Sequence, residues 1–246
     1  MRLEILPFST TTKYLGRLIG FDRPHEAEVD NRIRIAWKRF MAHKEELTCK
    51  SYTLRNRLRL FDSVVTSCVL YGAACWTLTQ ALQVKLQRTQ RKMLRMILGS
   101  GRRRKESAHT STEDYNDASD GEASSGTCSA SSTHMEPWTE WLQRTTRAAE
   151  AQLQKYRIDD WIMGWKRKVW RWAGRVASLA PDRWARKAML WQPETLAHAK
   201  GRSQAHPRKR WTDDIVKFLQ SQGTDVTLDS WHRHTTNWNI LENKFC

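Results

Sequence analysis

The stretch that decides the fold runs from Leu54 to Gly99 and reads LRNRLRLFDSVVTSCVLYGAACWTLTQALQVKLQRTQRKMLRMILG. Its apolar residues recur every three or four positions in two runs, which predicts two consecutive amphipathic helices. Gly72 ends the first helix, Thr77 or Thr79 can cap the second, and Gly99 closes it. Both runs are rich in arginine, so the stretch also predicts a basic surface.

The same helical spacing extends toward the N-terminus. A preceding helix is predicted by apolar residues three and four positions apart, namely Val29, Ile33, Ala36, Trp37 and Phe40. The three helices together predict a small bundle over residues 25–99. Ahead of them, the apolar residues within 1–24 suit short strands or a hairpin that leads into the bundle.

Charge divides the chain into three parts. The 246 residues carry 42 Lys and Arg against 26 Asp and Glu, a formal net charge of +16. Residues 1–105 hold 22 basic and 8 acidic side chains, residues 106–135 hold 6 acidic and no basic ones, and residues 136–246 hold 20 and 12. The middle part is rich in Ser, Thr, Asp and Gly, which predicts a disordered acidic linker over residues 100–136. That linker either competes weakly for the basic flanks or is a solvated spacer.

Tryptophan dominates the segment after the linker, where 11 of the 13 tryptophans lie between Trp138 and Trp238. Apolar spacing predicts one helix from Trp138 and another across 161–176. Pro181 suits the first turn of a third helix, and Thr212 can cap a fourth. These patterns predict a Trp-rich, all-helical C-terminal module over residues 137–246.

Composition also excludes several classes of protein. The strongly basic balance favours a polyanionic partner such as nucleic acid. The longest apolar run, Cys68 to Trp76, is too short to span a bilayer, and the N-terminus lacks the order of a signal peptide, so we expect an intracellular protein with no membrane role. Five cysteines without a Cys-x-x-Cys pair do not make a zinc site.

Landmarks in the first half carry a family resemblance. They are Arg57–Phe61, Leu70–Gly72, Trp76–Thr79 and Thr89–Gly99. In this order they resemble the segment that follows the palm in reverse transcriptases of non-LTR, LINE-like retrotransposons, where that segment is the thumb. The resemblance implies a thumb-like bundle, with residues 1–24 as a remnant of the palm. The catalytic aspartates, which hold the Mg²⁺ of the complete polymerase, would lie before residue 1. It therefore implies no catalytic residue, metal or cofactor in this chain.

The second half resembles, more loosely, the region after the thumb in RTE-like retrotransposon proteins. The matching residues are Glu136–Trp138, Gly201–Arg202, Pro207–Ile215, Trp238, Glu242 and Phe245. The spacing between Arg202 and Pro207 is longer than the family pattern.

An acidic pair, Asp213-Asp214, could be taken for polymerase aspartates. It follows Trp211 and precedes an amphipathic run, so it is predicted to lie in the first turn of a helix, where carboxylates complement the helix dipole. Trp211 either packs as a hydrophobic staple or stacks on a base. His232 and His234 lack a third ligand at a suitable spacing, so no metal site is predicted.

The remaining chemistry is binding. On the last helix of the bundle, Arg88, Arg91, Lys92 and Arg95 form a stripe at helical spacing, with no acidic residue in 85–105. The resemblance implies that this stripe contacts the backbone of a template–primer duplex, whereas the alternative is an ordinary solvated face. The complete set of candidate binding residues is Arg55, Arg59, Arg88, Arg91, Lys92, Arg95, Arg102, Arg103, Arg104, Arg202, Arg208, Lys209 and Arg210.

The sequence therefore predicts a mainly helical protein with a three-helix thumb-like bundle, a disordered acidic linker and a Trp-rich helical module. Its expected identity is the C-terminal part of a retrotransposon RNA-directed DNA polymerase that lacks the catalytic palm and binds RNA, an RNA–DNA hybrid or DNA. Two alternatives stay open: a transposon relic with no selected function, and a helical protein-interaction module. Residues 207–210 also fit a short nuclear import signal.

Overall fold

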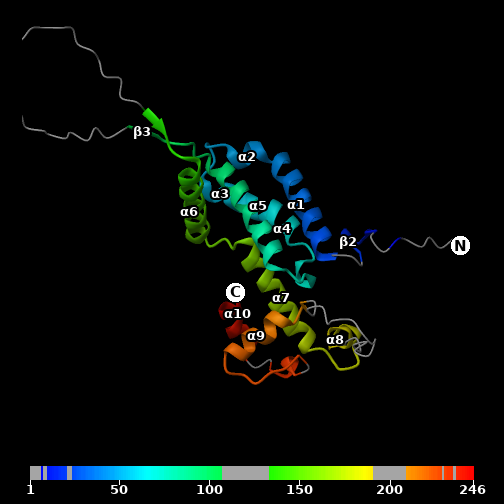
Figure 1. Ribbon diagram of the computed structural model, residues 1–246. Coiled ribbons are helices and arrows are strands. Elements are labelled where there is room, and N and C mark those ends of the chain that lie inside the picture. The colour runs from blue at the N-terminus through cyan, green and yellow to red at the C-terminus, as the bar shows by residue number, and fades with distance from the viewer. Residues whose placement is uncertain are drawn as a thin grey trace, which may run out of the picture.

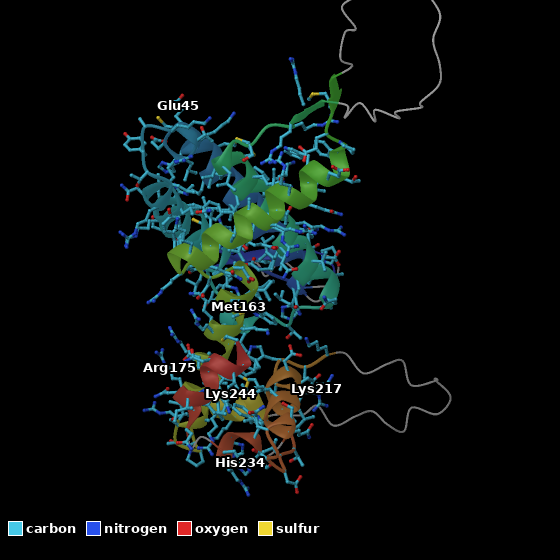
Figure 2. The ribbon with its side chains drawn as sticks, turned by 90° about the vertical axis from the view of Figure 1, so that its left-hand side faces the viewer. Glu45, Met163, Arg175, Lys217, His234 and Lys244 are labelled. Carbon is cyan, nitrogen blue, oxygen red and sulfur yellow. The ribbon has the colours of Figure 1, made fainter. Side chains whose placement is uncertain are left out.

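The computed structural model describes residue 7 and residues 10–20, 24–106, 133–190, 209–228, 230–234 and 237–246. In these residues the chain is mainly helical, which confirms the predicted fold class. Figure 1 shows two groups of helices, one built from the first part of the chain and one near the C-terminus. α7, Trp161–Ala177, runs from the first group into the second. Figure 2 shows Met163 of α7 at the level where the groups meet.

The first group contains the predicted bundle. In chain order its elements are α1 (Pro24–Ala42), α2 (Lys44–Thr48), α3 (Leu54–Phe61), a π-helical turn (Asp62–Thr66), α4 (Ser67–Val69), a 3₁₀ turn (Ala73–Cys75) and α5 (Gln80–Leu98). Val29, Ala36 and Phe40 of α1 are fully buried, and Ile33 and Trp37 pack against the same core. The predicted apolar face of the first helix is therefore confirmed.

Local signals set the ends of α5 as predicted. Of the two candidate caps, Thr79 is used: its hydroxyl accepts a hydrogen bond from the Leu82 N–H at 3.4 Å. At the other end Gly99 adopts a left-handed conformation, with φ of 62°, and its N–H bonds to the Arg95 carbonyl. Gly72 follows α4 with φ of 68°, which is likewise a conformation that suits glycine.

The second predicted helix contains an irregularity that periodicity did not indicate. Between α3 and α4, residues Asp62–Thr66 form a π-helical turn, in which the Ser67 N–H reaches back five residues to the Asp62 carbonyl. This turn places Thr66 where its hydroxyl accepts a hydrogen bond from the Trp161 indole at 3.0 Å. The π turn thus joins the bundle to α7.

Two helices after the predicted linker pack directly on this bundle. α6, Trp138–Tyr156, lies along α5, and the side chain of Gln90 in α5 accepts a hydrogen bond from the Trp161 N–H at 3.0 Å. The ring of Trp161 also stacks on Phe61, with ring centroids 6.2 Å apart. The division into modules stays a prediction, but packing places α6 with the first group and makes the core continuous.

A tryptophan pair forms the centre of the second group. Its elements are α7, α8 (Trp184–Leu190), α9 (Asp213–Ser221), a 3₁₀ turn (Trp231–Arg233) and α10 (Trp238–Phe245). The rings of Trp170 and Trp238 stack with centroids 3.9 Å apart, and each indole N–H donates to the carbonyl of the other residue, at 2.9 and 3.0 Å. Phe245 stacks on Trp170, and Glu242 pairs with Arg171. The C-terminal residues that carry the resemblance therefore hold α10 against α7.

Three predictions within these helices need correction. In α7 the buried tryptophans are Trp161, Trp165 and Trp170, whereas Trp172, which the sequence spacing places on the same apolar face, is half-buried, because that face passes through Ala173. α8 begins at Trp184 rather than at Pro181. Thr212 precedes α9 but makes no capping bond through its side chain.

The two β-sheets found among the described residues each have two short strands. β1 (Thr12–Tyr14) pairs antiparallel with β2 (Arg17–Ile19), which confirms the predicted hairpin before the bundle. β3 (Arg104–Glu106) pairs with β4 (Thr133–Met135), so both ends of the predicted linker are ordered strands, contrary to its predicted bounds of 100–136. The central part of that linker, residues 107–132, lies outside the described residues.

Candidate nucleic-acid interface

The predicted basic stripe on α5 contains two residues with partners on α6 and two exposed residues. Arg91 forms an ion pair with Glu150 of α6 at 2.6 Å, and Arg95 donates to the Thr146 hydroxyl at 3.1 Å. Burial and the neighbouring Arg91 lower the pKa of Arg95. Two of the four predicted cations thus have partners on a helix distant in sequence, which the spacing within α5 could not indicate.

The other two cations of the stripe remain on the surface. Arg88 and Lys92 are exposed, one helical turn apart, and the Lys92 ammonium lies 5.4 Å from the centre of the Trp37 ring. A cation over an aromatic face keeps its charge while its stem is held in place. This face of α5 can therefore present two charges to a phosphate backbone.

The arginines of α3 also have two different environments. Arg55 and Arg59 are exposed, whereas Arg57 between them is buried and donates to the Ile97 carbonyl at 2.6 Å, which ties α3 to the end of α5. Arg55 borders a shallow depression that is also lined by Lys155 and Arg157 at the end of α6. Lys155 and Arg157 could not be assigned to this surface from the sequence, because nothing local joins α6 to α3.

The Arg102–Arg104 segment is held by a buried carboxylate. Glu136 is 3 % exposed, and its carboxylate accepts hydrogen bonds from the Arg103 N–H at 3.1 Å and from the Arg144 guanidinium at 2.9 and 2.8 Å. These bonds, led by those from Arg144, lower the pKa of Glu136 to about 2. Glu136 therefore fixes the backbone at the start of β3.

The three arginines of this segment differ in what they can contact. The guanidinium of Arg102 donates twice to the Glu136 carbonyl, at 2.8 and 2.5 Å, so it is used within the fold. Arg103 and Arg104 are exposed. The three arginines are evident in the sequence, whereas the role of Glu136 in positioning them is not, because it lies more than 30 residues away along the chain.

The C-terminal basic loop is only partly described. Arg202 and Arg208 lie outside the described residues. Lys209 pairs with Asp214 at 2.6 Å and donates to the Leu78 carbonyl at 3.0 Å, while Arg210 is exposed. The indole of Trp211 donates to the Ala74 carbonyl at 2.5 Å and packs against the core, in agreement with its structural interpretation.

The acidic pair Asp213-Asp214 lies in the first turn of α9, as predicted. Asp213 accepts a hydrogen bond from the Arg210 N–H at 2.7 Å and Asp214 faces Lys209, so both carboxylates are used in holding the loop. In the part of the chain that the structure describes, no three His, Cys, Asp or Glu side chains gather as a metal site would require. These residues do not fit the two-metal centre of a polymerase.

A cavity of about 610 Å³ lies between α5, α6 and the start of α7. Its charged lining is largely paired: Arg91 with Glu150, and Arg167 with Asp159. A cavity whose cations already face carboxylates offers little attraction to a phosphate, so the exposed cations outside it are the better candidates.

Comparison with known proteins gives one informative similarity. No family model matches the chain, and no solved structure matches it. A protein of Caenorhabditis elegans described as an uncharacterized transposon-derived protein is 25% identical over 213 residues, which cover 86% of this chain. The match spans 61% of the length of that relative. This similarity supports a transposon-related origin for the chain. No helix among the described residues is long and apolar enough to cross a membrane.

Proposed function

We propose that this chain corresponds to the C-terminal part of the reverse transcriptase of a non-LTR retrotransposon and that it binds RNA or an RNA–DNA hybrid through exposed cations. Three observations support the proposal: the sequence landmarks between Arg57 and Gly99, which occur in the same order as in that family, the net charge of +16, and the similarity to a transposon-derived protein. RNA-directed DNA synthesis would belong to the complete polymerase, with its Mg²⁺ held by palm residues outside this chain.

The observation that carries the binding proposal is the separation of paired from exposed cations. Arg91 and Arg95 have partners on α6, an ion pair and a hydrogen bond, which compete with a phosphate for these two guanidinium groups. Several other cations, among them Arg55, Arg88 and Lys92, are exposed. A phosphate backbone that pairs with their charges releases its counterions, which favours binding. The set of exposed cations proposed for binding is Arg55, Arg59, Arg88, Lys92, Arg103, Arg104 and Arg210.

Fluorescence anisotropy of the full chain with a labelled RNA–DNA hybrid, measured across a salt series, tests this proposal. We expect Arg88→Ala/Lys92→Ala to weaken binding and to reduce the log–log salt slope by about 1.8, or about 0.9 for each lost contact. The matched control is Arg91→Ala/Arg95→Ala on the same helix, which should leave the salt slope unchanged in protein shown by circular dichroism to be folded. Binding that is absent, or equally affected by both pairs, would contradict the proposal.

One observation favours the protein-interaction alternative. At the β1–β2 hairpin, Tyr14, Leu15 and Ile19 are exposed apolar side chains, and Tyr71 beside them is about half exposed. Apolar side chains that gather on a surface mark contact sites. A partner bound there would show weak salt dependence, which separates this alternative from phosphate binding in the same titration.

A further inference from the structure

A tryptophan pair at the start of α6 is accessible in a way that most tryptophans of the molecule are not. Trp138 is 60% exposed, and its ring lies against Trp141 with centroids 4.5 Å apart and planes inclined by 32°. Trp141 in turn donates from its indole to the Ser100 carbonyl at 2.9 Å. The inner ring is therefore fixed to the segment before β3, and it supports the outer ring.

The exposed ring lies at the base of the β3–β4 ribbon. Figure 1 shows β3 beside the upper end of α6. The Glu136 N–H donates to the Arg103 carbonyl at 2.8 Å, which brings the Arg103 backbone next to the chain two residues before Trp138. The exposed residues Trp138, Arg103 and Arg104 therefore adjoin one another along the backbone and define a small surface. Because buried Glu136 holds the Arg103 backbone, this surface is built in advance of any ligand.

We propose that Trp138 is a stacking platform for a base of single-stranded RNA, with Arg103 and Arg104 contacting the neighbouring phosphates. This inference rests on the proposed nucleic-acid binding and adds a residue and a strand type to it. An exposed aromatic face beside cations is how proteins bind single strands without reading sequence, since every base has a π face to stack.

Other tryptophans are less suited to this role. Trp211 uses its indole within the fold, and most tryptophans of α7 and α10 are buried. Trp184 is 83% exposed, but it carries the Lys187 ammonium 5.3 Å from its ring centre and lies on α8 in the other group of helices. Trp184 is therefore a matched control for the loss of an exposed indole.

The test compares two single-stranded RNA oligomers that differ only in carrying bases or abasic sites. For the oligomer with bases, Trp138→Ala should weaken binding by about tenfold, while Trp138→Phe, which keeps an aromatic face, should retain most of the affinity. For the abasic oligomer the effect of Trp138→Ala should disappear. Arg103→Ala/Arg104→Ala should weaken both oligomers, and Trp184→Ala neither.

The outcomes separate this inference from the proposed function. If the chain binds RNA but Trp138→Ala has no effect, or has the same effect on both oligomers, the stacking platform is wrong and phosphate binding stands. If Trp138→Phe loses as much affinity as Trp138→Ala while circular dichroism shows folded protein, stacking is likewise overturned. If the unchanged chain binds neither oligomer nor the hybrid, both proposals fail together.

Discussion

The β1–β2 hairpin and the β3–β4 ribbon are both too short to be stable alone, and each is fastened to a helix by a buried glutamate with an arginine. At the hairpin, Glu28 of α1 accepts hydrogen bonds from the Leu18 N–H at 2.7 Å and from Arg32 at 2.8 Å. Arg32 then donates to the Gly16 carbonyl at 2.5 Å. One carboxylate and one guanidinium thus hold the second strand at Leu18 and the turn at Gly16.

The ribbon repeats this arrangement with different residues. Glu136 accepts from the Arg103 N–H and from Arg144 of α6, and Arg144 also donates to the Gly101 carbonyl at 3.0 Å. In both places a buried carboxylate binds a backbone N–H beside a strand, and its arginine continues to a glycine carbonyl. Sequence position does not reveal the likeness, because the arginine is four residues from Glu28 but eight from Glu136.

The two arrangements differ in their access to solvent. The Arg32 side chain is 6% exposed, and its guanidinium lies 4.6 Å from the centre of the Tyr71 ring. The Arg144 side chain is 27% exposed and lies beside a surface that carries Arg103 and Trp138. The comparison teaches that the same glutamate–arginine arrangement can be shielded from solvent and purely structural, as at the hairpin, or partly exposed and next to a binding surface, as at the ribbon. We call the hairpin arrangement the closed site and the ribbon arrangement the open site.

The largest expected effect is on stability at the closed site. Glu28→Ala leaves the buried guanidinium of Arg32 without its partner, and breaking a buried pair in this way costs about 3–5 kcal/mol in the free energy of unfolding. Urea denaturation measures the loss. Glu45→Ala is the control, because Glu45 is exposed on α2 and lies at the outer edge in Figure 2. A loss no greater than that of the control would show that the hairpin fastening is not a buried pair.

At the open site the corresponding change should cost less. Glu136→Ala frees Arg144, which can turn toward water, so the drop in the free energy of unfolding should be smaller than for Glu28→Ala. The same denaturation experiment gives the comparison. Equal losses for the two alanine variants would remove the distinction between a closed and an open fastening.

Acid should act on the ribbon through Glu136. Its pKa in the folded chain, about 2, lies below the ordinary value of 4.5. Its contribution to stability is therefore fully present above about pH 4.5 and is lost as the pH falls from there toward 2. Urea denaturation from about pH 5 to about pH 2.5 should show this loss in the unchanged chain. Glu136→Gln should lack that part of the pH dependence, and identical profiles for the two proteins would contradict the assignment.

The smallest expected effect is on RNA binding. It is measured by comparing one variant on the β3–β4 ribbon with one on the β1–β2 hairpin. Arg104→Ala on the ribbon should reduce the log–log salt slope for single-stranded RNA by about 0.7, the contribution of one phosphate contact. Lys13→Ala removes an exposed cation from the hairpin and should leave the slope unchanged. Anisotropy titrations measure both. A slope reduced equally by the two changes would mean that charge alone, and not position, determines binding.

Features with local causes could be predicted from the sequence. The ends of α5 at Thr79 and Gly99 follow from capping chemistry within the helix itself. The apolar face of α1 follows from spacing of three and four residues. Asp213 and Asp214 were placed in a first helical turn because the residues around them carry that signal.

Features that depend on distant partners could not be predicted in this way. Arg91 and Lys92 are adjacent, yet one pairs with Glu150 and the other is exposed, and only the packing of α6 decides between them. The π turn before Ser67 likewise has no periodic signature. The position of Glu136, a carboxylate just before a helix start in a basic protein, weakly indicates a structural role. Its hydrogen bond from the Arg103 N–H could not be predicted, because only the fold brings these two residues together.

Photo-crosslinking tests the central claim most directly. Single-stranded RNA that contains 4-thiouridine is bound to the full chain, irradiated and mapped by peptide mass spectrometry. The account predicts crosslinks at Trp138 and the adjoining ribbon, reduced by high salt, and none at the β1–β2 hairpin around Leu15. Crosslinks that fall on the hairpin and spare the start of α6, or that persist unchanged at high salt, would contradict it.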